Sequence, residues 1–565
     1  MTADELRQLF WYGSGALALV SAVLRPRAGR RAFAAVSRGA ARLGSVTWRW
    51  VAVCFVLGVA LPLYGAYQVR WPQPGIHDEF AYLLMAETFA DGRCAMPTPA
   101  LPEFFETYHV IQHPTYAAKY PPAMGVPLAI GIKLFGEPRA GLWLQAGALA
   151  ASIAWMLFGW LPRRWAVIGS LVGLLRFCAS GVWVQTFYNG AVAGIGGALA
   201  LGALGRILRA TEARPVRGWH GALLAVGLGI LANSRPFEGL VLGLVLAVAL
   251  ALWVVRRARR GALGAVRRLA APAVVVLVAC GAAMARYNYL VTGSATRLPY
   301  SVYDEQYAIY PPFLWQPLHE APPIRHAVMR EFSEGFQRGG YGAWGDASAM
   351  LDLAQARATE LAFDFVGWPL WLPLALFILR PRRRGVRWAA AALAATFAAL
   401  CTTTYLEPRY AAPVVSAMLL LVTFGLANLR RLPLVGRRLG RRLGPTVTLA
   451  FLFAFGATYV QDLLETYPPP ISWFGRVRAE VVRQLDASPG EDLVFVRYVE
   501  GHQPHHEWVV NGAHIDAQPI IWARDLGAAE NARLIERYPE RTLWTLTSGE
   551  LLRDGPILDP YAAPR

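Results

Sequence analysis

The stretch WRWVAVCFVLGVALPLYGAYQVRWPQPGIHDEF, residues 48–80, joins a long apolar run to a pair of adjacent carboxylates. Within 48–69 the only charged side chain is Arg49, and about 20 apolar residues suffice to cross a bilayer as a helix. Asp78 and Glu79 follow shortly after this run. Charged groups are costly near a membrane and are usually retained there for a function. The stretch therefore predicts a membrane-spanning helix that leads into an acidic site at the membrane surface.

The composition of the whole chain is that of an integral membrane protein. Of the 565 residues, 55% are hydrophobic, and the formal net charge is +18. A nucleic-acid-binding protein would carry such a charge on one folded face. Here the arginines stand in short blocks between apolar runs, which is typical of cytoplasmic loops. We therefore expect the lipid bilayer as a partner and no nucleic acid.

Apolar runs long enough to cross a bilayer recur along the chain. A shorter run at 9–24 is preceded by Asp4 and Glu5 and followed by a basic segment, which is the reverse of a cleavable signal peptide. This run predicts either an interfacial helix or one additional span. The eleven predicted spans are 48–69, 139–161, 165–187, 190–209, 219–234, 237–255, 270–290, 361–379, 386–404, 410–428 and 446–463.

The arginine blocks test this set of spans. If 48–69 runs from the inside to the outside, every second loop is arginine-rich, and these loops hold 30 of the 55 basic residues with one acidic residue, Glu212. This alternation obeys the positive-inside rule. We therefore predict an α-helical polytopic protein of the bacterial inner (cell) membrane with about 11–12 transmembrane helices. The arginine-rich segments are 25–49, 162–164, 206–217, 256–268, 380–387 and 429–445.

The same layout divides the chain into three predicted parts. Residues 1–47 form an N-terminal apolar and basic segment, and 48–463 form the transmembrane module, with external loops at 70–122 and 291–360. Residues 464–565 lie on the periplasmic, extracytoplasmic side. In this last part the strand-like stretches EDLVFVRYVE and RTLWTLTS alternate with the helix-like AAENARLIERY, which predicts a small α/β domain.

The first external loop contains the residues best suited to chemistry. Asp78 and Glu79 open a segment, EFAYLLMAETFADG, that predicts an amphipathic helix ended by Gly92. An aspartate at this position is either a helix N-cap or a functional carboxylate. Further along, Lys119 precedes a Pro-Pro pair and an apolar stretch at 123–136. That stretch is too short to span a bilayer and predicts a helix at the membrane edge.

In these motifs the chain resembles the GT-C class of membrane glycosyltransferases, and within it the branch of protein O-mannosyltransferases and lipid A aminoarabinose transferases. The resemblance covers the topology of roughly residues 48–463 and implies a GT-C-like fold, and 464–565 does not contribute to it. A tyrosine between the lysine and the prolines, and a Pro-rich lengthening at 96–110, depart from the family pattern. The motifs that carry the resemblance are Asp78-Glu79-x-x-Tyr82, Lys119-Tyr120-Pro121-Pro122 through Phe135-Gly136, and Arg409-Tyr410-x-x-Pro413.

The resemblance implies a glycosyltransferase that uses a polyprenyl-phosphate-linked sugar donor and no cofactor, with a lipid, glycan or protein as acceptor. Asp78 is the implied general base, and Glu79 would orient the acceptor or raise the pKa of Asp78. A leaving phosphate needs cations, for which arginine and lysine are suited. The implied phosphate- and donor-binding residues are Lys119, Arg235, Arg297, Arg409 and Tyr410, and the implied substrate contacts are Tyr82, His77, His113 and Tyr120. For each arginine, an ion pair with a loop carboxylate such as Glu238 or Glu407 is the alternative role.

The run RYVEGHQPHHEWVVNGAHID, residues 497–516, concentrates histidines and carboxylates. Imidazole and carboxylate suit zinc, but the spacing matches no HExxH pattern and Pro504 interrupts the run. We therefore expect a loop that caps the active site, and no metal. The five cysteines include no CxxC pair, so no disulfide framework is expected.

Other classes of function fit parts of the sequence. A polysaccharide polymerase or ligase would depend on arginines of a late loop, so a protein that stays active after Asp78→Ala would favour it. A transporter or flippase for lipid-linked sugars would carry ionisable residues deep in its spans, whereas Arg176 is the main one here. Turnover of a polyprenyl-phosphate sugar by the purified protein separates an enzyme from a transporter. A non-catalytic sensor would leave the loop-one motif unexplained.

Overall fold

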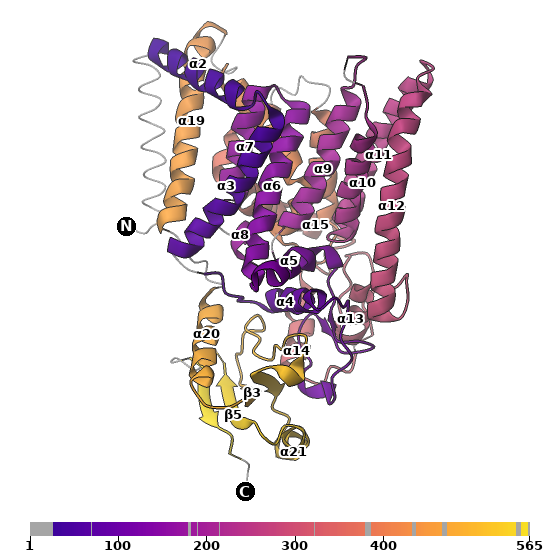
Figure 1. The fold of residues 1–565 in the computed structure, drawn as a ribbon, viewed down its shortest axis with the longest axis vertical. Coiled ribbons are helices and arrows are strands. Elements are labelled where there is room, and N and C mark those ends of the chain that lie inside the picture. The colour runs from indigo at the N-terminus through magenta and orange to yellow at the C-terminus, as the bar shows by residue number, and fades with distance from the viewer. Residues whose placement is uncertain are drawn as a thin grey trace.

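The computed structural model shows a bundle of helices with a small α/β unit at one end (Figure 1). The residues that the structure describes are 26–68, 71–178, 182–188, 190–213, 215–320, 322–378, 386–431, 437–465, 472–549 and 555–562. The apolar run predicted at 9–24 lies outside the described residues.

Each of the eleven predicted spans falls on helical structure. Within the described ranges, six helices are long and apolar enough to cross a membrane, or seven if one bent pair counts as a single span. The six are α3 (Thr47–Gln68), α6 (Pro138–Trp160), α9 (Ala191–Leu208), α11 (Pro236–Ala258), α12 (Leu263–Thr292) and the helix Pro408–Leu429, which joins η6 (Pro408–Val414) to α18 (Val415–Leu429).

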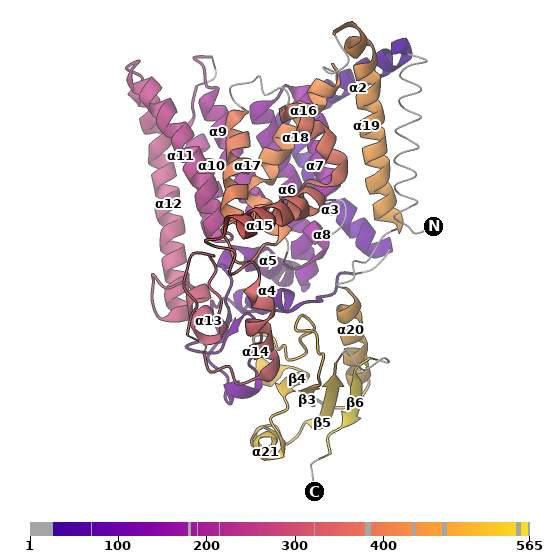
Figure 2. The same cartoon turned by 180° about the vertical axis from the view of Figure 1, so that it is seen from behind.

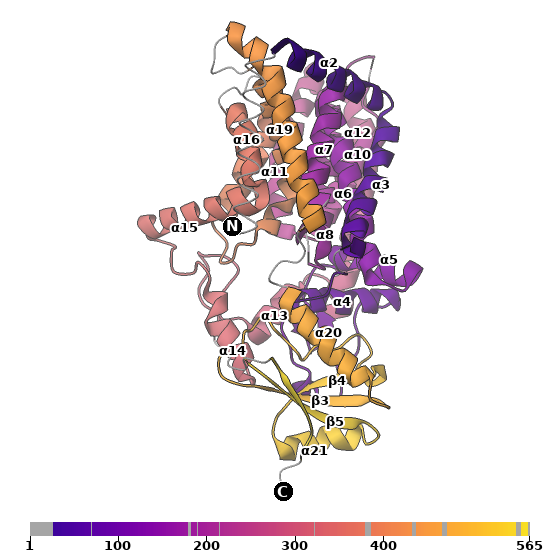
Figure 3. The ribbon, with the colours of Figure 1, turned by 90° about the vertical axis from the view of Figure 1, so that its left-hand side faces the viewer.

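The other predicted spans are shorter or interrupted helices, except for α19 (Arg437–Glu465), a continuous helix of 29 residues. The bent pair lies at the run 361–379, where the helix Ala347–Val366 meets the helix Trp368–Ile378 at 95°. The first of these contains α15 (Ala347–Glu360), which lies across the direction of the bundle (Figure 3). The remaining runs form α7 (Arg163–Cys178) with α8 (Val182–Gln185), α10 (Gly218–Ala232), α17 (Arg387–Leu400) and α19 (Arg437–Glu465), and the second half of the bent pair contains α16 (Trp371–Ile378).

The arginine-rich segments and the α/β unit lie at opposite ends of the bundle. The basic helix α2 (Pro26–Leu43) packs against α7 and α19 at one end, and the turn between α11 and α12 lies at that same end (Figure 1). At the other end lie α13 (Pro299–Tyr307) and α14 (Ala327–Glu334) of the second external loop, together with the C-terminal strands (Figure 2). The alternation of arginine blocks predicts this separation.

The C-terminal unit is built on a four-stranded sheet with the order β4-β3-β5-β6. β3 (Asp492–Tyr498) pairs in parallel with β4 (Ile520–Arg524) and β5 (Thr542–Ser548), and β6 (Ile557–Pro560) pairs antiparallel with β5. The strands predicted in 491–500 and 541–548 and the helix in 528–538, α21 (Ala528–Arg537), are confirmed. The strands β4 and β6 and the helix α20 (Ser472–Asp486) were not predicted.

The acidic pair of the first external loop lies on α4 (His77–Ala90), between α5 (Gly125–Phe135) and the C-terminal unit (Figure 1). The expectation of an amphipathic α4 is wrong, because buried residues occur all around the helix. Phe80, for example, packs with Phe474 and Trp508 of the C-terminal part. The expected ends of both helices are confirmed: Gly92 and Gly136 have left-handed φ values of 75° and 69°, which glycine adopts without steric cost.

Candidate functional site

Asp78 lies in the first turn of α4. The N-cap of α4 is Ile76, and no side chain caps this end. The interpretation of Asp78 as an N-cap residue is therefore wrong. A carboxylate in the first turn is still favoured by the positive end of the helix dipole, and its oxygens are available to other elements.

The neighbouring His77 and three side chains from other segments of the chain meet at the carboxylate of Asp78. The Tyr120 hydroxyl donates a hydrogen bond of 2.5 Å to Oδ1, and Nη2 of Arg409 donates one of 3.3 Å to the same oxygen. The other oxygen, Oδ2, lies 3.2 Å from Nδ1 of His77 and 3.7 Å from Nε2 of His109. One cluster therefore contains Asp78, Arg409 and Tyr120, which come from the three sequence motifs.

These neighbours set the charge of Asp78. Burial acts to raise the pKa of its carboxyl, but His109, the contact with His77 and Arg409 outweigh burial and hold the pKa well below its usual value. Asp78 is therefore ionised at neutral pH and able to accept a proton. We expected Glu79 to raise the pKa of Asp78, but Glu79 is not among the groups that set this shift, and the pKa is lowered overall.

Glu79 turns away from the Asp78 cluster. Its carboxylate accepts hydrogen bonds from the backbone N–H of Gly75 at 2.6 Å and of Phe187 at 2.8 Å. The side chain is buried, and burial raises the pKa to about 7 although these N–H groups oppose the shift. Glu79 therefore fastens the start of α4 to the segment that precedes α9.

Three cations of the cluster rest on aromatic rings, an arrangement that holds a charge in place while leaving its hydrogen-bond donors available. Aromatic rings also pack around them, and Tyr82 stacks on Tyr120 with ring centroids 4.3 Å apart. The cation–ring distances are 3.8 Å for Arg409 over Tyr188, 4.1 Å for Arg235 over Tyr410 and 4.2 Å for Lys119 over Tyr303.

Arg409 carries donors that the described part of the chain does not use. Its side chain is buried, and its one ion pair there is with Asp78. Nε and Nη1 of Arg409 are buried and have no hydrogen-bond partner among the described residues. A buried donor without a partner costs about 1–3 kcal/mol, and more when charged. The arginine fork suits an oxyanion such as a phosphate, so the chemistry of these two donors fits an anion.

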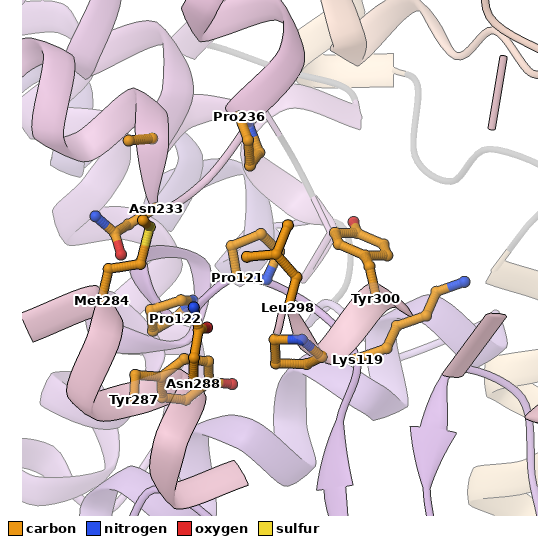
Figure 4. A pocket seen from close by; sticks show the side chains of 12 residues that line it. Lys119, Pro121, Pro122, Asn233, Pro236, Met284, Tyr287, Asn288, Leu298 and Tyr300 are labelled. Carbon is orange, nitrogen blue, oxygen red and sulfur yellow. The ribbon is translucent and has the colours of Figure 1, made fainter. Parts of the chain in front are cut away.

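Lys119 is placed by a short hairpin of β1 (Val110–Ile111) and β2 (Ala117–Ala118). Its backbone N–H donates to the carbonyl of His109 at 2.9 Å, which ties two residues of the cluster together. Burial lowers the pKa of Lys119, and Asp304 and Asp78 oppose this shift. In Figure 4 its side chain extends away from Pro121 and Pro122, which line the same small pocket.

Two of the predicted site residues are not part of this cluster. Arg297 is exposed and forms an ion pair with Glu305, so the alternative role of pairing with a loop carboxylate applies to it. His113 is exposed, and its carbonyl accepts a hydrogen bond from Gln306. By contrast, neither Glu407 nor Glu238 forms an ion pair with Arg409 or Arg235 in the described structure.

The cluster also contains residues that the sequence did not single out. His109 contacts Asp78 and has a left-handed φ of 63°, and Tyr188 lies under Arg409. His505 reaches His77 from the C-terminal unit, with Nδ1 3.0 Å from Nε2. A signal existed for His505, which belongs to the run expected to cap the site. No sequence signal distinguishes His109 from His113, and none identifies Tyr188.

The run 497–516 does not assemble a metal site. Glu507 pairs with Arg524 at 2.8 Å, His514 contacts Asp91, and His505 contacts His77. In the described ranges one group of histidines and carboxylates is close enough to hold a metal ion: His77, Asp78 and His109 each place a ligand atom within 4.8 Å of the others. Arg409 and Lys119 repel a further cation there unless an anion binds with it.

No protein-family model matches the sequence, and no curated protein matches it. Solved structures do match. The structure of ArnT from Cupriavidus metallidurans bound to undecaprenyl phosphate is 16% identical, with a TM-score of 0.50, and the match covers 91% of this chain and 96% of that one. The same protein in the apo state is 17% identical, with a TM-score of 0.47 and coverages of 89% and 93%.

A further match is the oligosaccharyltransferase from Archaeoglobus fulgidus, tethered to an acceptor peptide, which is 12% identical. Its TM-score is 0.45, and the match covers 88% of this chain and 69% of that one. Both proteins are GT-C glycosyltransferases. The superposition on ArnT bound to undecaprenyl phosphate confirms the fold that the resemblance implies, a polytopic helical membrane protein of the GT-C type. The C-terminal α/β unit, which was predicted from its own strand-like and helix-like stretches, is present in the structure.

Proposed function

We propose that this protein is a glycosyltransferase that moves a sugar from a polyprenyl-phosphate-linked donor to an acceptor on the extracytoplasmic side of the membrane. The observation that supports it most is the pairing of Asp78 with Arg409. One is an ionised carboxylate, and the other keeps Nε and Nη1 buried without partners in the described structure. An ionised carboxylate and two unused arginine donors thus lie side by side, as transfer from a phosphate leaving group requires.

The proposed reaction is a displacement at the anomeric carbon of the sugar. The acceptor oxygen forms the new bond to this carbon while the bond to the phosphate oxygen breaks, and the electron pair leaves with the phosphate. The proton of the acceptor hydroxyl passes to Asp78. Arg409, Arg235 and Lys119 stabilise the negative charge on the departing polyprenyl phosphate. Tyr82, Tyr120 and Tyr410 form the aromatic walls against which the sugar and the phosphate would pack.

The placement of the cluster supports a lipid-linked donor. It lies at the end of the helix bundle, between α5 and the C-terminal unit (Figure 1). A carrier whose tail stays in the bilayer can present its phosphate there. The arginine-rich segments at the opposite end support an extracytoplasmic site, and the ArnT structure was solved with undecaprenyl phosphate bound.

The test is turnover by the purified full-length protein in lipid nanodiscs. A panel of polyprenyl-phosphate pentoses and hexoses is offered with lipid, glycan and peptide acceptors, and mass spectrometry follows the release of polyprenyl phosphate. Release that depends on both acceptor and Asp78 supports the proposal. If the protein moves these lipids across vesicle bilayers without cleaving them, it is a flippase. If Asp78→Ala keeps full activity on an oligosaccharide donor, it is a polymerase or ligase.

A further inference from the structure

The C-terminal unit contributes one side chain to the cluster around Asp78. The loop after β3 carries His505, whose Nδ1 lies 3.0 Å from Nε2 of His77, with the two rings stacked at 5.0 Å between centroids. The ring of His505 also has an apolar neighbour: Phe336 packs against it edge-on, with the ring centroids 4.5 Å apart. His77 is itself buried, at 2% exposed, and stands next to Asp78 in the chain. The contact therefore links the C-terminal unit to the base.

We propose that His505 is a positioning residue of the transferase site, and that it acts through His77 to hold the carboxylate of Asp78 in its working orientation. This inference rests on the proposed function, because it assumes that Asp78 is the base. It gives the C-terminal unit, which carries no part of the loop-one motif, a direct role in the reaction.

The proton positions follow from the geometry. Nδ1 of His77 faces Oδ2 of Asp78 at 3.2 Å, and an ionised carboxylate only accepts hydrogen bonds. The contact favours a proton on this nitrogen, although the two groups are not in the alignment of a full hydrogen bond in this structure. When His77 carries a single proton, on Nδ1, its Nε2 is bare, and the bond between the two rings is donated by Nδ1 of His505. The bond from His505 selects the tautomer of His77 that attracts Asp78.

The opposite tautomer has a clear penalty. Without the donor on His505, the proton of His77 is free to move to Nε2, and a lone pair on Nδ1 would then face the carboxylate and repel it. Arg409 stands on the other side of Asp78 with Nε and Nη1 unused in the described structure. A carboxylate released from His77 would rotate into a two-bond contact with this arginine. In that contact Asp78 would no longer act as the base, and its carboxylate would occupy the arginine donors that are proposed to bind the phosphate.

The loop that carries His505 is held firmly against the first external loop. Two residues later, Glu507 forms a buried ion pair with Arg524, and Nε of Arg524 donates to the carbonyl of Glu106 at 2.9 Å. Farther along, the Tyr116 hydroxyl donates to the carbonyl of Asn511 at 3.1 Å. Both contacts join the C-terminal unit to the loop that holds Lys119. His505 is therefore delivered to a fixed position.

The experiment compares His505→Phe, which keeps an aromatic ring against Phe336 but removes the donor, with His505→Asn, which keeps an N–H near Nδ1. His514→Gln is the control, because His514 contacts Asp91 on the surface. We expect His505→Phe to lower kcat about 10- to 100-fold, the usual effect of losing such an outer contact. His505→Asn should recover most of the rate, and the control should match the wild type.

A double-mutant cycle separates positioning from a general structural role. Because His505 acts through His77, we expect His505→Phe to have no further effect on kcat in a protein that already carries His77→Phe. Additive losses would overturn the inference, as would a His505→Asn variant no better than His505→Phe. One bound divalent metal ion per chain, lost in His77→Phe, would also overturn it, because Nδ1 of His77 would then be a ligand.

A readout without turnover keeps this inference distinct from the proposed function. Nitrogen-15 NMR of the full-length protein with labelled histidine reports which nitrogen of His77 carries the proton. We expect Nδ1 to be protonated in the wild type and a mixture of tautomers in His505→Phe. An unchanged His77 signal would contradict the positioning role even if sugar transfer is observed. Failure of the wild type to transfer any sugar would reject the proposed transferase function. The NMR result would still show whether His505 sets the tautomer of His77.

Discussion

Arg409 and Asp78 are 331 positions apart in the chain and form an ion pair in which Nη2 lies 3.3 Å from Oδ1. The pair is asymmetric. Asp78 has neighbours on both of its oxygens, whereas Arg409 keeps Nε and Nη1 buried without partners in the described residues. An arginine that only balanced a carboxylate would use its fork on it. The remaining donors therefore point to a second anion.

The first prediction concerns Asp78. Asp78→Asn keeps the size and the hydrogen bond from Tyr120 but removes the base. We expect kcat for sugar transfer to fall by about 10²- to 10⁴-fold, while polyprenyl phosphate still binds. Steady-state kinetics and a direct binding assay check this, with Asp91→Asn at the exposed end of α4 as the control. Sugar transfer at the wild-type rate by Asp78→Asn would show that Asp78 is not the general base.

The second prediction compares two arginines that were both named from the sequence as phosphate-binding residues. Arg409→Gln removes a buried cation of the anion site, and we expect polyprenyl phosphate to bind roughly 10- to 100-fold more weakly, as for a lost charge-assisted hydrogen bond. Arg297→Gln removes an exposed cation that is paired with Glu305 and should leave binding unchanged. Equal losses in the two variants would contradict the assignment of the site.

The third prediction concerns the pH dependence of stability. Burial raises the pKa of Glu79 to about 7, so the folded protein holds this proton more tightly than the unfolded chain. The contribution is fully present below the usual glutamate pKa and is lost as the pH rises through about 7. We expect the free energy of unfolding to fall between pH 5 and pH 8 by on the order of 3 kcal/mol from this group.

Denaturant unfolding of the wild type and Glu79→Gln at both pH values checks this prediction. The variant should show a flatter dependence, since it cannot titrate. Asp78 does not interfere, because its depressed pKa acts with the opposite sign and only in more acidic solution. Identical pH dependence in the two proteins would show that Glu79 does not titrate in this range.

The fourth prediction concerns the buried pair that anchors the C-terminal unit. Arg524 and Glu507 are 3% and 0% exposed and lie 2.8 Å apart. Arg524→Gln leaves Glu507 as an uncompensated buried charge, which typically costs about 3–5 kcal/mol. Arg497→Gln breaks a pair in which the arginine is 60% exposed and should cost less than about 1 kcal/mol. Hydrogen exchange of the backbone amides in β3 and β4 measures the loss of stability in each variant. Similar protection in the two variants would contradict the prediction.

The sequence predicts those parts of the fold that follow from local pattern. Hydrophobic runs locate the helices of the bundle, Gly92 and Gly136 mark the ends of α4 and α5, and stretches rich in β-branched and aromatic residues identify β3 and β5. β4 was missed because IIWAR is a short apolar run without alternation, which is expected of a strand covered on both faces. The burial of α4 was missed because it depends on contacts from the C-terminal unit, which no local pattern records.

The site was predictable where a motif carried it. Asp78, Lys119, Tyr120 and Arg409 were named from the sequence, and the structure brings them together. Arg297 belongs to no motif and was named as a cation near the outer surface, and its ion pair with Glu305 becomes visible only in the folded chain. Glu79 was assigned a role beside Asp78, whereas adjacent residues on a helix point in different directions. The position of His109 depends on its left-handed backbone conformation, and that of His505 depends on the docking of the C-terminal unit. Neither could be predicted from local sequence.

The most direct measurement of the central claim is a cryo-electron microscopy structure of the full-length protein with polyprenyl phosphate bound. We predict that the phosphate oxygens accept hydrogen bonds from Nε and Nη1 of Arg409, with Lys119 or Arg235 as a second cation and Asp78 alongside. A phosphate farther than about 4 Å from all three cations, beyond ion-pair reach, would contradict the claim.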